Sequence, residues 1–419
     1  MTAPDGFERM EKPIVSASLR QVQQYSLRRQ GFAPRLADTI PAVANEIFGL
    51  YGTAPTCYLS LAARLEHFKL EDLDAQLYSH RTIIRMRAMR GSAFLVPTSL
   101  VPAVHQATAV TARVAFRRLI EKCGVSEAEY RKISAKISDA VSSPLTVNEI
   151  RGAVNPQLPA ANRAFNFIVG LMCAEGLLVR ATVRGGWKSN LYRYARFEDW
   201  LPAVKLASIE PREARATLAR LYFDTFGPAT RMDFAWWSGF SKSEVGECIA
   251  DISGELSPVA VRETPGEHYM TREGTLELRA EKTPAPRRVT LLPPWDAYLM
   301  AYRSRARLVS DADYGYVYDR AGNSTYVILI NGVVRGVWDL YDEKDASVFK
   351  FALLDKASKG VLTDLAETAS ALSNSLGIDE VRLQQCPRPT VLTQGANRFL
   401  APLKDSKCKA VRVDSSGLK

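Results

Sequence analysis

The sequence predicts an α+β chain that is predominantly helical, with tandem helix–turn–helix units followed by a C-terminal β-barrel. Two observations carry this prediction. Capped helical segments followed by alternating, strand-like segments occur three times at intervals of about 80–90 residues. Short runs of β-branched and aromatic residues then dominate residues 286–360. With 419 residues, of which 47% are hydrophobic, the chain can bury several cores.

The first unit is expected over residues 1–100. Ser18, with Gln21 three residues later, is typical of a helix N-terminus, and that helix should end at Gly31. The run TIIRMRAMRGSAFLVP then predicts two strands joined by a cationic turn, which makes the hairpin a wing beside the helices. The further helices expected in this unit span residues 41–50, 55–65 and 70–78, and the second and third of the four are separated by the turn at 51–54.

The second unit is expected over residues 101–205. Thr146 and Glu149 form a capping-box pattern at the start of a short helix, and a longer helix should run from Pro159 to Gly176. Alternating residues on both sides of Gly185-Gly186 then predict a hairpin with a basic, partly aromatic tip.

The third unit is expected over residues 206–285. Thr230 with Asp233, and Ser241 with Glu244, repeat the cap pattern. The expected helices span residues 213–227, 230–239 and 241–252, and strands are expected at 257–263 and 276–282. The adjacent residues Trp236 and Trp237 are interpreted as core residues rather than a platform for base stacking.

Residues 286–360 are expected to form the β-barrel. Asn331-Gly332 between two apolar runs is typical of a two-residue hairpin turn. The segments 314–319 and 348–354 are also predicted to be strands. Residues 361–419 should contribute a helix, predicted over 360–377, and a basic tail.

Several classes of protein are excluded. The six cysteines form no C-x-x-C pair and the four histidines are not at ligand spacing, so we expect neither a disulfide framework nor a metal site. The phosphate-loop, dinucleotide-binding and serine-hydrolase motifs are absent, so no cofactor is expected. No signal peptide precedes the first unit and no apolar run is long enough to cross a bilayer, so we expect a cytoplasmic protein without membrane contact.

The charge distribution favours a nucleic-acid partner. The formal net charge is +10, and residues 101–200 carry 14 lysines and arginines against eight acidic residues. Solvated surface charge is the alternative explanation. For the helix that bears Arg113 and Arg117, this alternative is nearly as good as DNA contact. The candidate phosphate contacts are Arg184, Lys188 and Arg193 in the second hairpin, Arg87 and Arg90 in the first, and Arg113 and Arg117, four residues apart on one helix face.

Four segments resemble the winged-helix DNA glycosylases of the AlkZ and YcaQ type: GLYGTAPTCYLSLAARL, RTIIRMRAMRGSAFLVP, LLPPWDAYLMAYRSRARLV and VILINGVVRGVW. The third, a Leu-Leu-Pro-x-x-Asp-x-Tyr-Leu core before an arginine-rich stretch, is the most specific. The resemblance implies tandem winged helices and a barrel around a cationic channel for double-stranded DNA. It also implies that a monomer, nucleoid-associated when bound, hydrolyses the N-glycosidic bond of bulky alkylated or crosslinked purines without a metal or cofactor. Arg303 and Arg305 of the arginine-rich stretch are then further DNA-contact candidates.

The resemblance also places the chemistry. The family carries Gln-x-Gln or Gln-x-Asp after the second helix to orient a water, and the matching positions here are Tyr51 and Thr53. The Thr53 hydroxyl can hydrogen-bond a water, and Tyr51 can pack against the lesion or donate a hydrogen bond. Where the family tends to place a histidine in the first hairpin, this chain has Phe94. These departures keep one alternative open, a non-catalytic DNA-binding protein that acts as lesion sensor or transcriptional regulator. A protein-interaction scaffold is a further alternative, because winged helices also serve that role.

Overall fold

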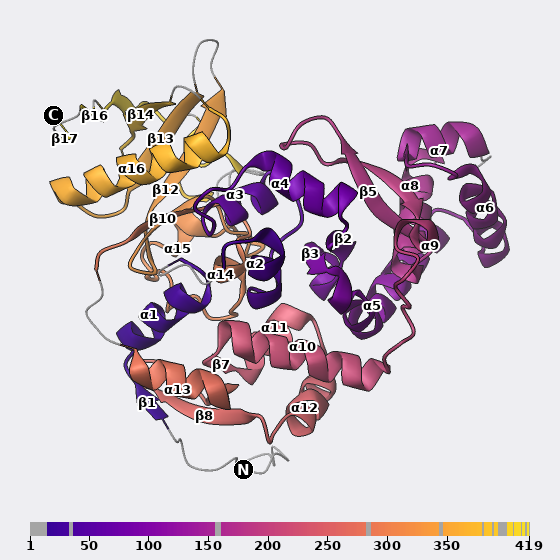
Figure 1. Ribbon diagram of the computed structural model, residues 1–419, viewed down its shortest axis with the longest axis horizontal. Coiled ribbons are helices and arrows are strands. Elements are labelled where there is room, and N and C mark those ends of the chain that lie inside the picture. The colour runs from indigo at the N-terminus through magenta and orange to yellow at the C-terminus, as the bar shows by residue number, and fades with distance from the viewer. Residues whose placement is uncertain are drawn as a thin grey trace.

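The computed structural model describes residues 15–32, 37–155, 161–281, 286–342, 347–378, 381–387, 389–392, 400–404, 406–411, 413–414 and 417–418. The chain is a mixed α/β protein with mostly helical first two thirds and a strand-rich C-terminal part. Three groups of elements surround the helices α2, α3 and α4: the strands with α16, the group α6–α8, and the group α10–α13 (Figure 1).

The N-terminal part contains the expected helices and hairpin. Ser18 accepts a hydrogen bond from the Gln21 amide, so the predicted cap is confirmed. The strand before it pairs in parallel with a strand of the third unit, at Val15 and Val259, and so joins two distant parts of the chain. The elements are β1 (Val15–Ala17), α1 (Leu19–Arg29), α2 (Ile40–Glu46), α3 (Thr56–Ala62), α4 (Leu70–Asp74) with a following π-helical turn (Ala75–Ser79), β2 (Ile83–Arg87), a 3-10 turn (Met89–Gly91), β3 (Ala93–Pro97) and a 3-10 turn (Thr98–Leu100).

The second part confirms the cap at Thr146, whose side chain and that of Glu149 form a capping box. The hairpin is also present, but its strands stop at Arg184 and resume at Leu191, so its tip is longer than a two-residue turn. Pro159 lies outside the described residues. The elements are α5 (Val101–Lys122), α6 (Glu127–Ala140), β4 (Leu145–Thr146), α7 (Val147–Val154), α8 (Ala161–Glu175), β5 (Leu178–Arg184), β6 (Leu191–Arg196) and α9 (Phe197–Trp200).

The first two hairpins belong to one five-stranded sheet with the order β3-β2-β5-β6-β4. Arg85 of β2 pairs with Arg180 of β5 at the junction. The second hairpin is thereby fixed beside the first, and its tip reaches the segment between α2 and α3.

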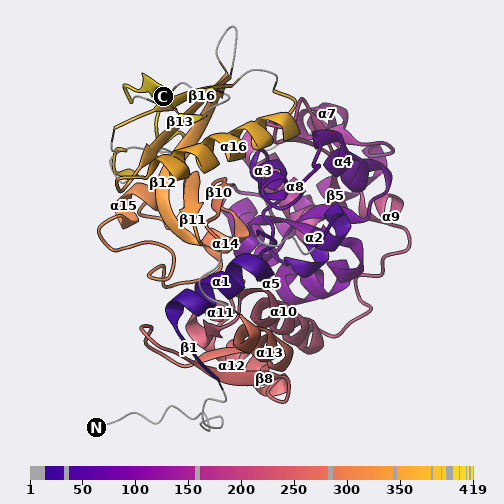
Figure 2. The same cartoon turned by 60° about the vertical axis from the view of Figure 1, so that its left-hand side comes forward.

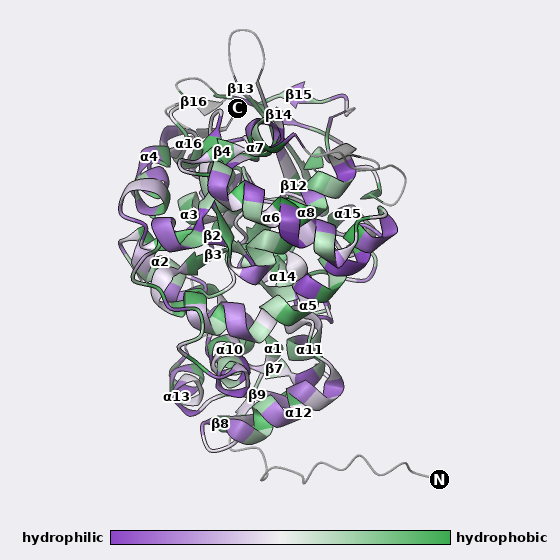
Figure 3. Cartoon of the chain, turned by 90° about the vertical axis from the view of Figure 1, so that its right-hand side faces the viewer, coloured by the Kyte–Doolittle hydropathy of each residue, from purple (hydrophilic) through white to green (hydrophobic). Residues whose placement is uncertain are grey.

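In the third part, the caps at Thr230 and Ser241 are confirmed, each as a capping box. The strand predicted at 276–282 is wrong, because Thr271 caps a helix there. Its Leu278 is buried, and Arg28 of α1 pairs with Glu277 and Glu281, so the helix packs on α1. The elements are α10 (Pro211–Phe226), β7 (Ala229–Thr230), α11 (Arg231–Ser238), α12 (Lys242–Asp251), β8 (Leu256–Val261), β9 (His268–Thr271) and α13 (Arg272–Ala280). Polar and apolar residues alternate along α12, as expected for a surface helix (Figure 3).

Among the described residues, the C-terminal strands form one sheet whose two edge strands do not pair, so the predicted β-barrel is not found there. The strand order is β10-β11-β12-β13-β14-β15, and β14 joins in parallel after a crossover through α16, which extends the sheet outward. Helix α16 lies against this sheet (Figure 2). The elements are β10 (Val289–Leu292), α14 (Ala297–Met300), α15 (Tyr314–Val317), β11 (Val327–Ile330), β12 (Val333–Asp342), β13 (Ser347–Leu353), α16 (Lys359–Ser375), β14 (Val381–Gln385), β15 (Lys409–Ala410), β16 (Val413–Asp414) and β17 (Gly417–Leu418).

Individual predictions for this part have mixed outcomes. The hairpin at Asn331-Gly332 is confirmed: both residues have positive φ, 52° and 83°, and Ile330 pairs with Val333. The helix at 360–377 is also confirmed by α16. The strand predicted at 314–319 is wrong, because this segment forms the short helix α15 and stacks Tyr314 on Tyr318 one turn later, with ring centroids 5.1 Å apart.

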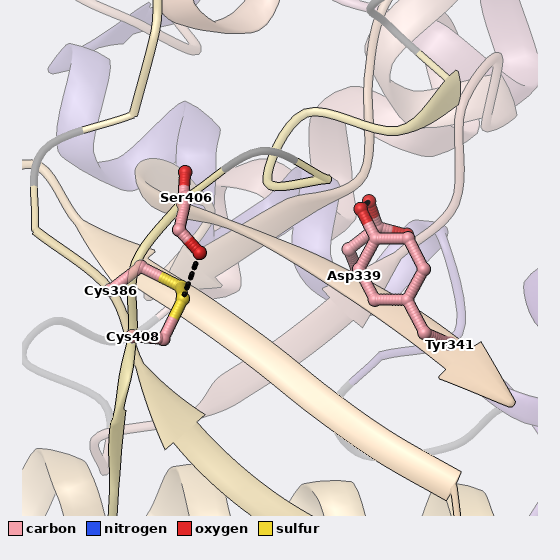
Figure 4. Close-up of a disulfide and its surroundings, with 5 residues drawn as sticks. All are labelled: Asp339, Tyr341, Cys386, Ser406 and Cys408. Carbon is pink, nitrogen blue, oxygen red and sulfur yellow. Dashed lines mark hydrogen bonds between the residues drawn. A yellow bond between two sulfur atoms is a disulfide. The ribbon is translucent and has the colours of Figure 1, made fainter. Parts of the chain in front are cut away.

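A disulfide joins Cys386 and Cys408, which the expectation of no disulfide framework did not foresee (Figure 4). The two cysteines are 22 residues apart and come together because the segments before and after them pair as β14 and β15. The other four cysteines are free thiols. Within the described ranges, no helix is both long and apolar enough to span a bilayer, and no three potential metal-binding side chains cluster.

Candidate active site

The turn between α2 and α3 runs alongside strand β3. The amide of Gly52 donates to the Ala93 carbonyl, and the Leu95 amide donates to the Leu50 carbonyl, each over 2.8 Å. A Cβ at Gly52 would lie 2.9 Å from the backbone of Phe94, so the close approach requires glycine. The strand therefore fixes the direction in which Tyr51 and Thr53 leave the turn.

Two side chains hold the rest of this turn. Arg85 Nε donates to the Gly52 carbonyl at 3.0 Å. Asn190, at the tip of the second hairpin, accepts from the Ala54 amide at 3.0 Å and donates to the Ala54 carbonyl at 2.7 Å. The same tip places Trp187 against Tyr58, with ring centroids 6.1 Å apart. The turn is thus fixed by the first and second hairpins together.

The Leu-Leu-Pro-Pro-Trp-Asp motif docks on α3. Asp296 receives two hydrogen bonds from Arg64, at 2.8 and 2.9 Å, and one from Ser60, at 2.6 Å. Both charged side chains are completely buried, which is tolerable because each carboxylate oxygen is hydrogen-bonded by the guanidinium. The pair therefore anchors the preceding Trp295 close to the turn at 51–54.

Trp295 is held in an uncommon backbone conformation. Its φ of 57° lies in the left-handed region, where a bulky residue is strained and needs support from its surroundings. That support comes from its amide, which donates to Ser324 Oγ at 2.8 Å, and from its indole Nε1, which donates to Asn323 Oδ1 at 2.9 Å. The ring is fixed as one wall of a cavity.

Residues from the first three predicted units and from the region 286–360 meet in this cavity, which has a volume of about 390 Å³. It lies beside the catalytic turn that the resemblance implies. The Thr53 hydroxyl oxygen is covered and has no hydrogen-bond partner among the described residues. An unsatisfied buried hydroxyl costs about 1–3 kcal/mol, so it marks a position where a further partner is needed. The lining residues are Tyr51, Thr53, Arg87, Arg90, Gly91, Ser92, Ala93, Arg180, Trp236, Trp295, Met300, Ala321, Gly322 and Asn323.

The cavity is cationic. Of the described residues that line it, three are arginines and none is acidic. The Arg90 guanidinium lies 4.6 Å from the centre of the Trp236 ring, and the Arg305 guanidinium lies 4.4 Å from the same ring. Arg305 is only 6% exposed, and neither of its terminal nitrogens has a hydrogen-bond partner within the described part of the chain.

Burial sets the protonation of the groups in this cavity. It raises the pKa of Tyr51, and the cations Arg90 and Arg305 offset only part of that effect. The phenol therefore stays protonated at neutral pH and acts as a hydrogen-bond donor, not as a base. Burial, followed by repulsion from Arg180, lowers the pKa of Arg87 below its usual value.

The structure brings together four of the predicted site residues, Tyr51, Thr53, Arg87 and Arg90, with Arg305 behind the Trp236 ring. Arg184 and Lys188 are exposed at the tip of the second hairpin, and Arg193 lies on β6.

Three other predicted contacts lie elsewhere. Arg113 donates to the Ala174 carbonyl and bonds His105 Nε2, and Arg117 pairs with Glu127 and Glu175, so both tie α5 to its neighbours. Arg303 lines a separate cavity of about 570 Å³ at the start of α11.

Sequence reasoning missed Arg180, Asn190, Trp236 and Trp295. Trp236 and Trp237 were expected in the core: Trp237 is buried, whereas Trp236 is partly buried against the core and also lines the cavity. Trp295 lies inside the most specific motif, so its position was available from the sequence. No pattern in the sequence indicated Arg180 or Asn190, because their contacts depend on pairing between hairpins.

Comparison with known proteins agrees with this architecture. The model of the AlkZ-like DNA glycosylase family matches residues 47–374, which is most of the chain. A curated interstrand DNA cross-link repair glycosylase of Streptomyces sahachiroi is 23% identical over 341 residues, covering 79% of this chain and 90% of that protein. The solved structure of Streptomyces sahachiroi DNA glycosylase AlkZ superimposes with a TM-score of 0.74 at 20% identity, covering 88% of this chain and 100% of that one. The chain therefore belongs to the AlkZ-like DNA glycosylase family, whose members are hydrolases of N-glycosyl bonds in DNA.

Proposed function

We propose that this glycosylase removes bulky alkylated or crosslinked purines from double-stranded DNA, with the chemistry at the turn that bears Tyr51 and Thr53. The observation that carries the proposal is the covered Thr53 hydroxyl, which lacks a partner among the described residues and belongs to the wall of the cationic cavity. The crosslink-repair name of the Streptomyces relative supports the substrate class.

In the proposed reaction, Thr53 accepts or donates a hydrogen bond to a water and orients its oxygen toward the anomeric carbon of the sugar. The water oxygen forms a bond to that carbon while the glycosidic bond breaks. The electron pair of the glycosidic bond leaves with the purine nitrogen. The water's proton passes to solvent. An N7-alkylated purine is cationic before cleavage and departs as a neutral base, so positioning supplies the required assistance without a strong base. Tyr51 contributes a protonated phenol as donor.

We further propose that a monomer holds the duplex through three winged-helix units, bounded at residues 1–100, 101–205 and 206–285, ahead of the C-terminal strands at 286–360 and the tail at 361–419. Phosphate contacts would come from Arg184, Lys188 and Arg193 of the second hairpin and from the cavity arginines. Arg303 would extend this surface at the start of α11. Arg113 and Arg117 would contribute mainly by orienting α5 against α8.

The proposal is tested by base release from a duplex that carries one bulky N7-alkylguanine. The wild-type protein should release the base, and Thr53→Ala should release it at least about tenfold more slowly, because loss of one positioning hydrogen bond costs about 1.4 kcal/mol or more of transition-state stabilisation. Thr53→Ser keeps the hydroxyl and should retain most of the rate. Arg212→Ala removes a surface arginine that pairs with Asp251 and serves as the control.

Equal rates for the wild-type protein and Thr53→Ala would remove Thr53 from the chemistry. A second candidate function, lesion binding without hydrolysis, is favoured by one observation: of the described residues that line the cavity, none carries a carboxylate or an imidazole. Tight binding of the same duplex with no base release from any alkylated purine would support that function.

A further inference from the structure

The cavity beside Thr53 holds more positive charge than the protein neutralises. Arg87 donates to the Gly91 carbonyl, Arg180 lies over the Tyr192 ring and interacts with the Tyr194 hydroxyl, and Arg90 contacts the Trp236 ring. None of the three forms an ion pair within the described ranges. Like charges held together without a counterion raise the energy of the unliganded protein, and an anionic ligand relieves that cost.

The carboxylate beside one loop of the cavity does not relieve this charge. Asp319 precedes the loop that contributes Ala321, Gly322 and Asn323 to the cavity. Its two oxygens accept hydrogen bonds from the amides of Ala321 and Asn323 and from the Asn323 side chain, at 2.8–2.9 Å. That carboxylate therefore shapes the loop and leaves the three guanidiniums to an external partner.

Arg305 adds a fourth cation, which lies against the Trp236 ring that lines the cavity. Its guanidinium lies against Trp236 at 4.4 Å and Tyr318 at 4.9 Å, is 6% exposed, and has both terminal nitrogens without a hydrogen-bond partner within the described part of the chain. Aromatic faces stabilise a buried cation only partly. Because Arg90 and Arg305 both contact the Trp236 ring, the positive potential converges on the wall that faces Tyr51 and Thr53.

We propose that this cavity is the seat of a backbone phosphodiester next to the lesion, and that the damaged base itself lies elsewhere. This inference deepens the proposed function and rests on it for the identity of the nucleic acid. A cationic N7-alkylpurine would be repelled by three guanidiniums, whereas a phosphodiester matches their charge and their donor geometry.

The proposed seat also has a consequence for the reaction. Positive charge develops on the sugar as the glycosidic bond breaks, and unneutralised arginines near Thr53 would oppose it. A phosphodiester in the seat cancels that opposition and brings a negative charge close to the sugar. Occupation of the seat therefore both places the nucleotide and makes the surroundings of Thr53 compatible with cleavage.

The test measures binding, so that it does not depend on catalysis. The probe is a duplex with one 2′-fluoro lesion nucleotide, which resists cleavage, in which each phosphate within three nucleotides of the lesion is replaced in turn by an uncharged methylphosphonate. For the wild-type protein we expect one replacement to weaken binding about tenfold, the loss expected for a charge-assisted contact, and the others to have much smaller effects.

The same series with Arg90→Gln/Arg180→Gln assigns the contact. This variant should bind the unmodified duplex more weakly and should lose the sensitivity to that one replacement, because the partner is already gone. Arg90→Lys keeps a charge at the mouth of the cavity and should keep part of the sensitivity. Arg212→Gln, which alters a surface arginine on α10, should behave as the wild-type protein does, and thermal melting checks that each variant is folded.

Two results would overturn the inference. Unchanged sensitivity to the same replacement in the double variant would show that the phosphate lies against other residues. Tighter binding of a duplex with a cationic base after removal of the arginines would show that the base occupies the cavity. A protein that passes this test but releases no base would retain the seat and lose the proposed function, so the two failures are distinguishable.

Discussion

At the scale of single residues, burial decides which ionisable groups can serve the reaction and which only shape stability. Tyr51 is kept protonated by burial, so it donates hydrogen bonds beside Thr53. Asp339 of β12 is 3% exposed, and its carboxylate accepts from the Tyr341 hydroxyl and the Leu340 amide (Figure 4). Burial nevertheless raises the pKa of Asp339 to about 6. This carboxyl lies on β12 of the C-terminal sheet and does not line the cavity at the turn.

The raised pKa gives a prediction for Asp339→Asn. The folded pKa lies above the unfolded value of about 3.9, so this group's favourable contribution is complete below about pH 4 and is lost as the pH rises through 6. The substitution should therefore increase the free energy of unfolding at pH 7.5 by about 1 kcal/mol and have less effect at pH 5. Urea unfolding at both pH values measures this difference. A cost of equal size at both values would show that the carboxylate is stabilised by its hydrogen bonds instead.

At the scale of elements, the second hairpin acts as a support for the turn between α2 and α3. Asn190 forms both hydrogen bonds to Ala54, while the Tyr192 hydroxyl donates to the Asn190 side chain at 2.7 Å and fixes its orientation. The exposed basic residues lie on the same tip. The proposed contact of this hairpin with DNA would therefore be linked to the position of Thr53 through one short segment.

This link predicts a separation of effects in Asn190→Ala. Base release should slow about tenfold, because a small displacement of a positioning group is costly, while affinity for the duplex changes less than about twofold. Hydrogen exchange at the Ala54 amide should accelerate, and exchange at the Gly52 amide, bonded to β3, should not. Asn148→Ala removes an exposed asparagine of α7 whose side chain accepts a hydrogen bond from Arg151, and it is the matched control. Unchanged exchange at Ala54 would show that Asn190 does not hold the turn.

At the scale of the whole molecule, two buried histidines in separate parts of the fold make the stability of the folded protein depend on pH. His105 of α5 accepts from Arg113, and His268 of β9 lies in the sheet that joins β1 to the third unit. Burial is the main cause that lowers the pKa of each to about 4, assisted by Arg113 for His105 and by Arg307 for His268. Both side chains are therefore neutral in the folded protein.

This predicts acid lability. Because the folded pKa lies below the unfolded value of about 6.5, the stabilisation is complete above pH 6.5 and is lost as the pH falls toward 4, at up to about 3 kcal/mol for each histidine. Between pH 6.5 and 4.5, the free energy of unfolding of the double variant His105→Gln/His268→Gln should fall less steeply with decreasing pH than that of the wild-type protein. Chemical denaturation across that range measures the slopes, and parallel slopes would assign the acid lability to other groups.

The sequence by itself determined the helix caps at Ser18, Thr146, Thr230 and Ser241 and the hairpin at Asn331-Gly332, because these depend on residues within a few positions of one another. It also indicated the turn that bears Thr53, through the resemblance. It failed at 276–282 and 314–319, where a short alternating pattern suits a strand or a helix and packing on neighbouring elements selects the helix.

Only the tertiary structure decided what surrounds Thr53. Arg180, Trp236 and Trp295 come from three distant segments, and each is brought to the cavity by contacts that no local pattern encodes: pairing of β2 with β5, the position of α11, and the buried pair of Arg64 with Asp296. The arrangement of the C-terminal strands was decided in the same way. The crossover through α16 adds β14 in parallel beside β13, and the two edge strands of the described sheet, β10 and β15, do not pair. Local interactions fix the helix caps and tight turns of this chain, whereas long-range pairing and burial fix the site.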